Sequence, residues 1–279
     1  VLSSFEQLLA EGYVTAQTGS GTFVADTLPD QLAQPSAENF SADDDSSTSP
    51  SLLSRKLSAR GDAMSAVAGG RMFEVQPFAP GDADYSAFPF KLWQRLQNKY
   101  WRAGRPELMD YGQTGGYLPL RQAIADYLRV SRSVRVTVDQ VLITAGTQQS
   151  LDLCAHLLAD HHDTAWVEDP CYWGARRALE ANGLNLHPVP VDNDGMNPGV
   201  EDMEKNPRLI YLTPSHQYPK SVVMSLARRR LLLEIAARKS AWILEDDYDS
   251  EFRYAGRPLA SLQSMDHHDR VLYLGTFAK

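Results

Sequence analysis

The stretch EDDYDSEF (245–252) directly follows the apolar run AWIL (241–244) and decides how this chain is interpreted. It places five carboxylates within seven residues, just after a segment with the length and composition of a buried strand. Two similar runs also end in polar groups: VLIT (141–144) leads into AGTQQSL, and VLYLG (271–275) leads into TFAK. Because the carboxyl ends of parallel strands meet at one edge of a sheet, we expect these groups to lie together.

Strand-like and helix-like segments alternate from about residue 71 to the end of the chain. The expected strands are 141–144, 164–167, 184–191, 209–213, 241–244 and 271–275. The expected helices lie near 90–102, 117–129, 148–158, 172–182 and 226–239. This alternation predicts an α/β fold with a mostly parallel sheet that is covered by helices on both faces.

The first 25 residues have a different pattern. Residues 1–12 are helix-like, and two short β-rich segments, 13–17 and 22–25, flank the turn TGSG, which predicts a helix followed by a β-hairpin. The next part contains SADDDSSTSP (41–50), a composition typical of a linker.

We therefore expect three parts, with boundaries at 1–25, 26–70 and 71–279. Neither end of the sequence resembles a domain edge, so we expect the chain to belong to a longer protein.

Composition excludes several classes of protein. The formal net charge is −8, and residues 1–54 contain no Lys or Arg, so we expect this chain by itself to bind DNA poorly. Its two cysteines, Cys154 and Cys171, form no C-x-x-C pattern, which argues against a disulfide framework and a zinc site and favours the cytoplasm. No apolar run approaches the roughly 18 residues that a membrane helix needs, so no membrane partner is expected.

The three strand ends carry different chemistry. The turn AGTQQSL (145–151) opens a helix, whose backbone N–H groups can bind an anion such as phosphate, although an ordinary capped helix start has the same pattern. The acidic cluster can bind a divalent cation, pair with a cationic ring nitrogen, or form an exposed loop. A nucleotide site of the P-loop kind is excluded, because the chain has no G-x-x-x-x-G-K-[ST] motif.

Lys279 completes the pattern after the last expected strand. A lysine in a desolvated setting has a lowered pKa and becomes a nucleophile toward carbonyl groups, whereas a surface lysine would only extend into solvent. A phosphate anchor, a carboxylate for a pyridinium nitrogen and an amine for an aldehyde are together what pyridoxal phosphate requires.

The sequence resembles the MocR-type bacterial regulators, in which a GntR-type winged helix-turn-helix precedes a domain like the large domain of fold-type I aminotransferases. The first 25 residues resemble the end of the recognition helix and the wing, and residues from about 73 to 279 resemble the aminotransferase-like domain. The runs that carry the resemblance occur in the family's order: YGQTGGYLPLRQAIADYL (111–128), ITAGTQQSL (143–151), EDPCYWGAR (168–176), TPSHQYP (213–219), LEDDYDSEFRY (244–254) and GTFAK (275–279).

The resemblance implies a role for each matching residue. Lys279 matches the lysine that forms a Schiff base with pyridoxal phosphate, and Asp246 matches the carboxylate that keeps the pyridine nitrogen protonated. Tyr248 matches the phenol that contacts the ring hydroxyl, and Tyr172 matches the aromatic residue stacked on the cofactor. The positions that match the phosphate-binding residues are Gly146, Thr147, Gln148 and Thr276.

One loop leaves two assignments open and departs from the family. His216 or Gln217 lies near the position of an asparagine that also contacts the ring hydroxyl. The sequence Pro219-Lys220-Ser221 follows, where the family usually has Pro-Thr-Gly.

Two functions are compatible with these residues. The resemblance implies a homodimeric transcriptional regulator that binds DNA and senses pyridoxal phosphate or an amine or amino-acid effector. The alternative is a pyridoxal-phosphate-dependent aminotransferase, which exchanges an amino group between an amino acid and a 2-oxo acid, with Lys279 as the catalytic lysine. The helix, hairpin and linker of residues 1–70 favour the regulator, because a free-standing aminotransferase does not need them.

The role of Lys279 can be tested directly. We expect Lys279→Ala to abolish the absorbance band that pyridoxal phosphate gives when it is joined to the intact protein, because alanine has no amine. Lys239→Ala, which changes a lysine in an expected helix, is the control and should keep the band. An unchanged band in Lys279→Ala would remove this lysine from its role.

Overall fold

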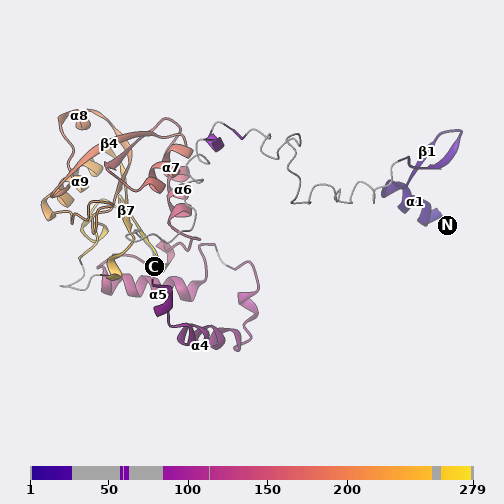
Figure 1. Cartoon of the computed structure of the whole chain (residues 1–279), viewed down its shortest axis with the longest axis horizontal. Coiled ribbons are helices and arrows are strands. Elements are labelled where there is room, and N and C mark those ends of the chain that lie inside the picture. The colour runs from indigo at the N-terminus through magenta and orange to yellow at the C-terminus, as the bar shows by residue number, and fades with distance from the viewer. Residues whose placement is uncertain are drawn as a thin grey trace, which may run out of the picture. The chain divides into compact units, whose positions relative to one another are not determined.

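The computed structural model describes residues 2–26, 57–58, 60–62, 84–112, 114–252 and 259–277. The chain divides into two compact units, Val1–Lys56 and Leu57–Lys279 (Figure 1). Most of the expected linker, 26–70, lies outside the described residues.

The first unit contains the helix and hairpin expected from the sequence. Helix α1 spans Leu2–Ala10, and strand β1 (Val14–Gln17) pairs antiparallel with β2 (Gly21–Val24). Gly19 and Gly21 have φ angles of 84° and 110°, which glycine adopts at little cost, so the TGSG turn can close the hairpin. Its origin as part of a winged helix stays a prediction.

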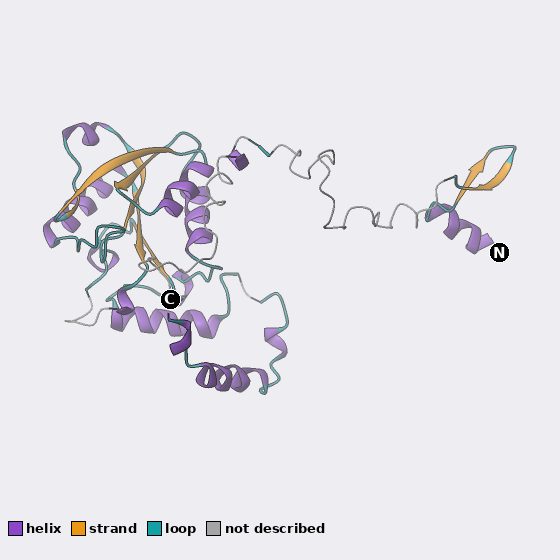
Figure 2. Ribbon diagram, in the orientation of Figure 1, coloured by secondary structure: helices purple, strands orange, loops and turns teal. Residues whose placement is uncertain are grey.

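The second unit is built on a six-stranded sheet in the order β5-β4-β3-β6-β7-β8 (Figure 2). All neighbouring pairs are parallel except β5, which runs antiparallel to β4. The strands are β3 (Thr164–Asp169), β4 (Asn185–Asp192), β5 (Gly195–Met196), β6 (Pro207–Leu212), β7 (Trp242–Asp247) and β8 (Val271–Gly275). The predicted α/β class with a mostly parallel sheet is confirmed.

Helices precede and connect these strands. They are α4 (Phe90–Trp101), α5 (Leu118–Ser131), α6 (Thr147–Leu158), α7 (Trp173–Ala181), α8 (Val200–Glu204) and α9 (Leu226–Lys239). Single turns of 3₁₀ helix span Tyr85–Ala87, Pro106–Leu108, Val138–Gln140, Ser250–Phe252 and Gln263–Met265. The five helices expected in this unit are all present, within a few residues of their expected bounds.

The expected strand 141–144 is wrong. This segment is extended but pairs with no described strand, and the N–H of Ile143 donates instead to the carbonyl of Gly115 at 2.9 Å. A Cβ atom on Gly116 would lie 2.7 Å from the Ile143 side chain, so the segment packs closely on a glycine turn. The segment therefore packs on this turn and is not a member of the sheet.

Two hydrophobic cores cover the two faces of the sheet. Figure 1 shows α6 and α7 on one side and α9 on the other. The first core joins Leu151 of α6 and Leu179 of α7 to side chains such as Leu244 of β7. The second joins Leu232 of α9 to Trp166 and Ile243. Strand side chains alternate between these cores, as the two-residue period requires.

The alternation separates the three carboxylates at the end of β7. Asp246 follows Leu244 on the α6/α7 face, whereas Glu245 and Asp247 follow Ile243 on the α9 face. All three carboxylates are less than 5% exposed. Each therefore needs hydrogen-bond donors or a cation inside the protein.

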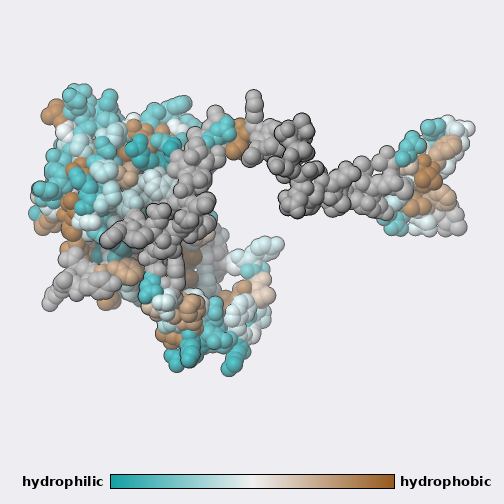
Figure 3. Space-filling view, in the orientation of Figure 1, coloured by the Kyte–Doolittle hydropathy of each residue, from teal (hydrophilic) through white to brown (hydrophobic). Residues whose placement is uncertain are grey.

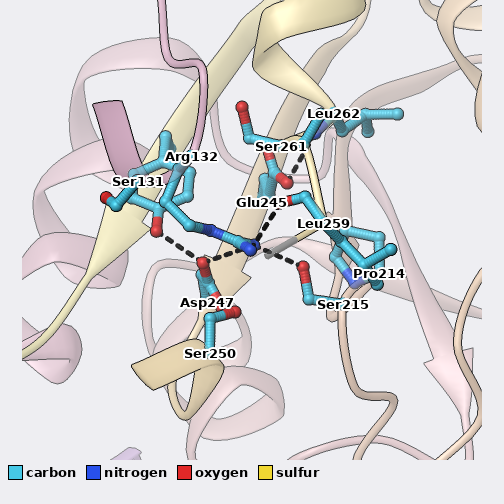
Figure 4. A network of polar contacts seen from close by, with 12 residues as sticks. Ser131, Arg132, Pro214, Ser215, Glu245, Asp247, Ser250, Leu259, Ser261 and Leu262 are labelled. Atoms are coloured by element: carbon cyan, nitrogen blue, oxygen red, sulfur yellow. Dashed lines mark hydrogen bonds and ion pairs between the residues drawn. The ribbon is translucent and has the colours of Figure 1, made fainter. Parts of the chain in front are cut away.

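Polar contacts at the α9 face join α5 and two loops to the end of β7 (Figure 4). Arg132, directly after α5, forms an ion pair with Asp247 at 2.7 Å. The same guanidinium donates to the Ser215 hydroxyl at 2.7 Å and to the Leu259 carbonyl at 2.6 Å. Glu245 accepts hydrogen bonds from the N–H groups of Leu262 and Gln263 at 2.7 and 2.9 Å. Asp247 and Glu245 thus have structural partners.

No residue of helix α4 is buried, although the helix is 12 residues long. Phe90, Trp93 and Trp101 are between 53% and 69% exposed, and apolar residues are visible on this part of the surface (Figure 3). The expected homodimer would give this helix a partner; that assignment stays a prediction.

The Arg132–Asp247 pair generates a stability prediction. We expect Asp247→Ala to lower the free energy of unfolding by about 3–5 kcal/mol, because the buried Arg132 would lose its counter-charge. Asp126→Ala is the control: it breaks the Arg129–Asp126 pair, whose side chains are 49% and 55% exposed, and should cost less than about 1 kcal/mol. Urea unfolding measures both, and equal losses would contradict a structural role for the buried pair.

Candidate functional site

The candidate site lies where β6 and β7 end on the α6/α7 face of the sheet. Asp246 is 4% exposed there, and the hydroxyl of Tyr211 donates to its Oδ2 atom at 2.7 Å. Burial, together with the charge of Asp246, raises the pKa of Tyr211 well above its ordinary value. Tyr211 therefore remains a neutral phenol that donates to the carboxylate.

Aromatic rings form one wall of the site. The ring of Tyr218 packs edge-on against Tyr172 at 5.8 Å and against Tyr248 at 6.2 Å between centroids. His216 stacks on Tyr248 at 5.9 Å, and its Nδ1 atom lies 3.3 Å from the Tyr248 hydroxyl. Sequence reasoning missed Tyr218, although its aromatic character within TPSHQYP was visible. The predicted residues Tyr172, Tyr248 and His216 are thus brought together.

The structure distinguishes the two residues that the sequence left open. His216 lies beside Tyr248 and also contacts the carboxylate of Asp249. Gln217 is 2% exposed, and its amide nitrogen donates to the carbonyls of Pro170 and Tyr218, both at 2.7 Å. The Gln217 amide therefore holds the loop together, and His216 is the residue that presents a ring nitrogen next to Tyr248.

The loop that contains Pro219-Lys220-Ser221 places a serine in a left-handed conformation. The Tyr218–Pro219 peptide bond is cis, and Ser221, at the position of the family's glycine, has a φ of 59°. A left-handed conformation favours glycine, so serine pays a conformational cost here. The Lys220 ammonium donates to the Val191 carbonyl at 2.7 Å, and this bond attaches the loop to β4.

The start of α6 is suited to an anion. Gly146 is the N-cap residue, and a Cβ atom added to it would have no other atom within 4 Å, so the backbone there faces open space. The first N–H groups of a helix have no partner within the helix, and they carry its positive dipole end. Thr147 and Gln148 form the first turn, and the Gln148 amide donates to the Tyr172 hydroxyl at 3.3 Å.

The remaining predicted residues follow β8. Asp246 is paired with Leu274 in the sheet, so the half-buried Thr276, two residues further on, lies at the same edge. Lys279 lies outside the described residues, and its role stays a prediction.

Glu168, at the end of β3, is a buried residue that sequence reasoning missed. Its Oε2 atom accepts hydrogen bonds from the Thr213 hydroxyl at 2.7 Å and the Thr213 N–H at 3.2 Å, and it lies 3.3 Å from the Gln217 amide. Burial raises the pKa of Glu168 to about 7. This carboxyl group connects β3 to the loop that carries His216 and Tyr218. Nothing in the run EDPCYWGAR distinguishes Glu168 from the adjacent Asp169, so the sequence does not signal this role.

The family comparison agrees with this geometry. Residues 81–279 match the family model described as aminotransferase class I and II. The chain belongs to that family. Among solved structures, it resembles a multiple substrate aminotransferase from Thermococcus profundus, with a TM-score of 0.67 and 29% identity over 83% of this chain and 59% of the other. The fold-type I assignment is thereby confirmed.

Curated relatives include regulators with a helix-turn-helix. The chain is 41% identical to a probable rhizopine catabolism regulatory protein, MocR, of Rhizobium meliloti, over 100% of this chain and 54% of the relative. It is 31% identical to an HTH-type pyridoxine biosynthesis transcriptional regulator of Corynebacterium glutamicum, with the same coverage. The MocR-type resemblance is confirmed, and the chain spans about half the length of these relatives.

The cofactor of this family is pyridoxal phosphate. An alpha-aminoadipate aminotransferase from Thermus thermophilus, with a TM-score of 0.64 and 30% identity over 72% of this chain and 52% of the other, was solved with a phosphopyridoxyl-leucine compound. The described residues fit such a cofactor: Asp246 is a buried carboxylate beside an aromatic wall, and the open start of α6 is at the same end of the sheet. No helix among the described segments is long and apolar enough to cross a membrane.

The buried carboxyl of Glu168 predicts a pH dependence of stability. Its pKa is about 7 in the folded protein and 4.5 in a model peptide, so the folded state binds more protons between these values. Stability from this group is present below about pH 4.5 and is lost as pH rises through 7.

We expect the free energy of unfolding to fall less between pH 5 and pH 8 in Glu168→Gln than in the wild type, by up to about 3 kcal/mol. Urea unfolding at the two pH values measures the difference, and Glu201→Gln, on the exposed start of α8, is the control for removing one glutamate. The same pH slope in Glu168→Gln and the wild type would show that Glu168 is ionised throughout.

Proposed function

We propose that this chain is part of a cytoplasmic, homodimeric transcriptional regulator whose aminotransferase-like unit binds pyridoxal phosphate through a Schiff base to Lys279. In this proposal the unit senses the cofactor itself or an amine or amino-acid effector. The observation that carries the proposal is the length of the match: the MocR relative covers the helix–hairpin unit as well as the aminotransferase-like unit. A free-standing aminotransferase has no use for the first of these.

The residues of the site have distinct roles in this proposal. Asp246 accepts a hydrogen bond from the protonated ring nitrogen of the cofactor. Tyr248 donates to the ring hydroxyl, because burial and the neighbouring charges of Asp249 and Asp246 raise its pKa and keep it protonated. His216 assists at the same hydroxyl, and Tyr172 packs on the ring. The phosphate is held by Gly146, Thr147, Gln148 and Thr276.

Bound pyridoxal phosphate supplies an aldehyde that reacts with amines and a ring that withdraws electrons. Asp246 and the start of α6 would hold that ring in one orientation, since both lie at the same end of the sheet and on the same face. The rings of Tyr172, Tyr218 and Tyr248 form an aromatic wall that keeps water away from one side of the site. Gln217 and Glu168 keep the loop with His216 in place.

The alternative function is that of a working aminotransferase. The chain is 31% identical over 74% of its length to an aromatic-amino-acid aminotransferase of Thermococcus litoralis, and this likeness favours it. The two functions predict the same cofactor site. They differ in whether an amine that reaches this site alters DNA binding or is converted into a product.

A mobility-shift titration separates the two. The full-length protein is titrated against the DNA upstream of its own gene, with and without pyridoxal phosphate, and with a panel of amino acids. We expect a specific shift whose midpoint moves with the cofactor or an amine, and a response that is lost in Asp246→Ala. The same protein without residues 1–26 is the control: it should bind pyridoxal phosphate but give no shift. Absence of a specific shift together with steady turnover of an amino acid and a 2-oxo acid would favour the aminotransferase.

A further inference from the structure

Two tyrosine–aspartate pairs lie on opposite faces of β7. On the α6/α7 face, the Tyr211 hydroxyl of β6 donates to Asp246 at 2.7 Å. On the α9 face, the Tyr273 hydroxyl of β8 donates to Asp247 at 2.5 Å. The register explains the arrangement, because Tyr211 pairs with Leu244, two residues before Asp246, and Tyr273 pairs with Glu245, two residues before Asp247. The protein thus contains two instances of one contact in different surroundings.

We propose that Tyr211 is a positioning residue for the cofactor: its hydroxyl fixes the orientation of the Asp246 carboxylate and keeps that group ionised for the pyridine nitrogen. This inference rests on the role proposed above for Asp246. Tyr211 itself is fully buried in the core between the sheet and α6 and α7, so it acts through Asp246.

A buried carboxylate needs such a donor. Removal from water disfavours the charged form, and hydrogen bonds to that form favour it. Glu168 shows how strong the first effect is at this end of the sheet, since burial raises its pKa to about 7 although it accepts bonds from Thr213. Tyr211 is well suited to oppose the same effect at Asp246, because it is rigid, neutral and within 2.7 Å.

Other titratable groups face Asp246 and Tyr211 from the elements around them. Glu168 of β3 and Tyr248 after β7 interact electrostatically with Asp246, and Cys171, before α7, interacts with Tyr211. Burial raises the pKa of Cys171 to about 12, so it is a neutral thiol. Of these groups, Tyr211 donates a hydrogen bond to the Asp246 carboxylate, and it comes from the neighbouring strand.

Asp247 has other partners besides its tyrosine. It has the buried Arg132 as a counter-charge at 2.7 Å and also accepts a hydrogen bond from the Ser250 hydroxyl. Tyr273→Phe therefore makes the same chemical change as Tyr211→Phe, on the adjacent residue pair, but on the face away from the site. It is the matched control.

The test is the affinity of the full-length protein for pyridoxal phosphate, measured by absorbance titration from pH 5.5 to 8.5. We expect Tyr211→Phe to weaken binding about tenfold at pH 7.5, the effect of losing one hydrogen bond to a charged group. The acid limb of the binding profile should also move to higher pH, because a carboxylate without its donor takes up a proton more readily. Tyr273→Phe should keep the wild-type affinity and profile.

Two results would overturn the inference. One is wild-type affinity and pH profile in Tyr211→Phe while Asp246→Ala binds weakly. The other is an equal loss at every pH, which would indicate a general effect on the core. If Asp246→Ala itself binds normally, the proposed role of Asp246 fails, and this inference fails with it.

If Tyr211→Phe alone folds poorly, the double variant Asp246→Asn/Tyr211→Phe is compared with the single variant Asp246→Asn. In Asp246→Asn no buried charge depends on the tyrosine, so adding Tyr211→Phe should weaken pyridoxal phosphate binding no further. An additional loss in the double variant would show that Tyr211 acts on the packing of the core and not through Asp246.

Discussion

Burial of three consecutive carboxylates at the end of β7 is the constraint on which the second unit depends. Glu245, Asp246 and Asp247 are each less than 5% exposed, and a buried charge is costly unless it is paired or hydrogen-bonded. Because successive side chains of a strand point to opposite faces, Glu245 and Asp247 lie on the α9 face and Asp246 lies on the α6/α7 face. The unit must therefore supply donors on both sides of the sheet at the same point, and the loops and helices at this edge are arranged to do so.

The two faces meet this requirement differently. On the α9 face, Arg132 and the backbone N–H groups of Leu262 and Gln263 satisfy Asp247 and Glu245, so these carboxylates join α5 and two loops to the sheet. On the other face, Asp246 has a neutral donor in Tyr211 and lies beside an aromatic wall. The Arg132 guanidinium neutralises the charge of Asp247, whereas the Tyr211 phenol that donates to Asp246 is uncharged.

The same edge of the sheet gathers the other parts of the proposed cofactor site. The start of α6, the loop with His216 and Tyr218, and the residues after β8 all follow from where parallel strands end. A regulator that uses this site as a sensor needs the same binding geometry as an enzyme. What distinguishes the two functions is the preceding unit, a helix and a hairpin that the regulator relatives also match.

The sequence alone determined the fold class, the hairpin and the family. Alternating periodicities indicated the parallel sheet, the TGSG turn indicated the hairpin, and the order of motifs identified the family and its cofactor. The strand 141–144 was predicted wrongly, because a β-rich segment packed on the Gly115–Gly116 turn has the same composition as a strand. Only the tertiary structure decided that Asp247 is paired with Arg132, that His216 rather than Gln217 lies beside Tyr248, that Tyr211 donates to Asp246, and that Tyr218 packs against Tyr248. The physical reason is that partners come from distant segments: Tyr211 and Asp246 are 35 residues apart, and their contact exists only once two strands are in register.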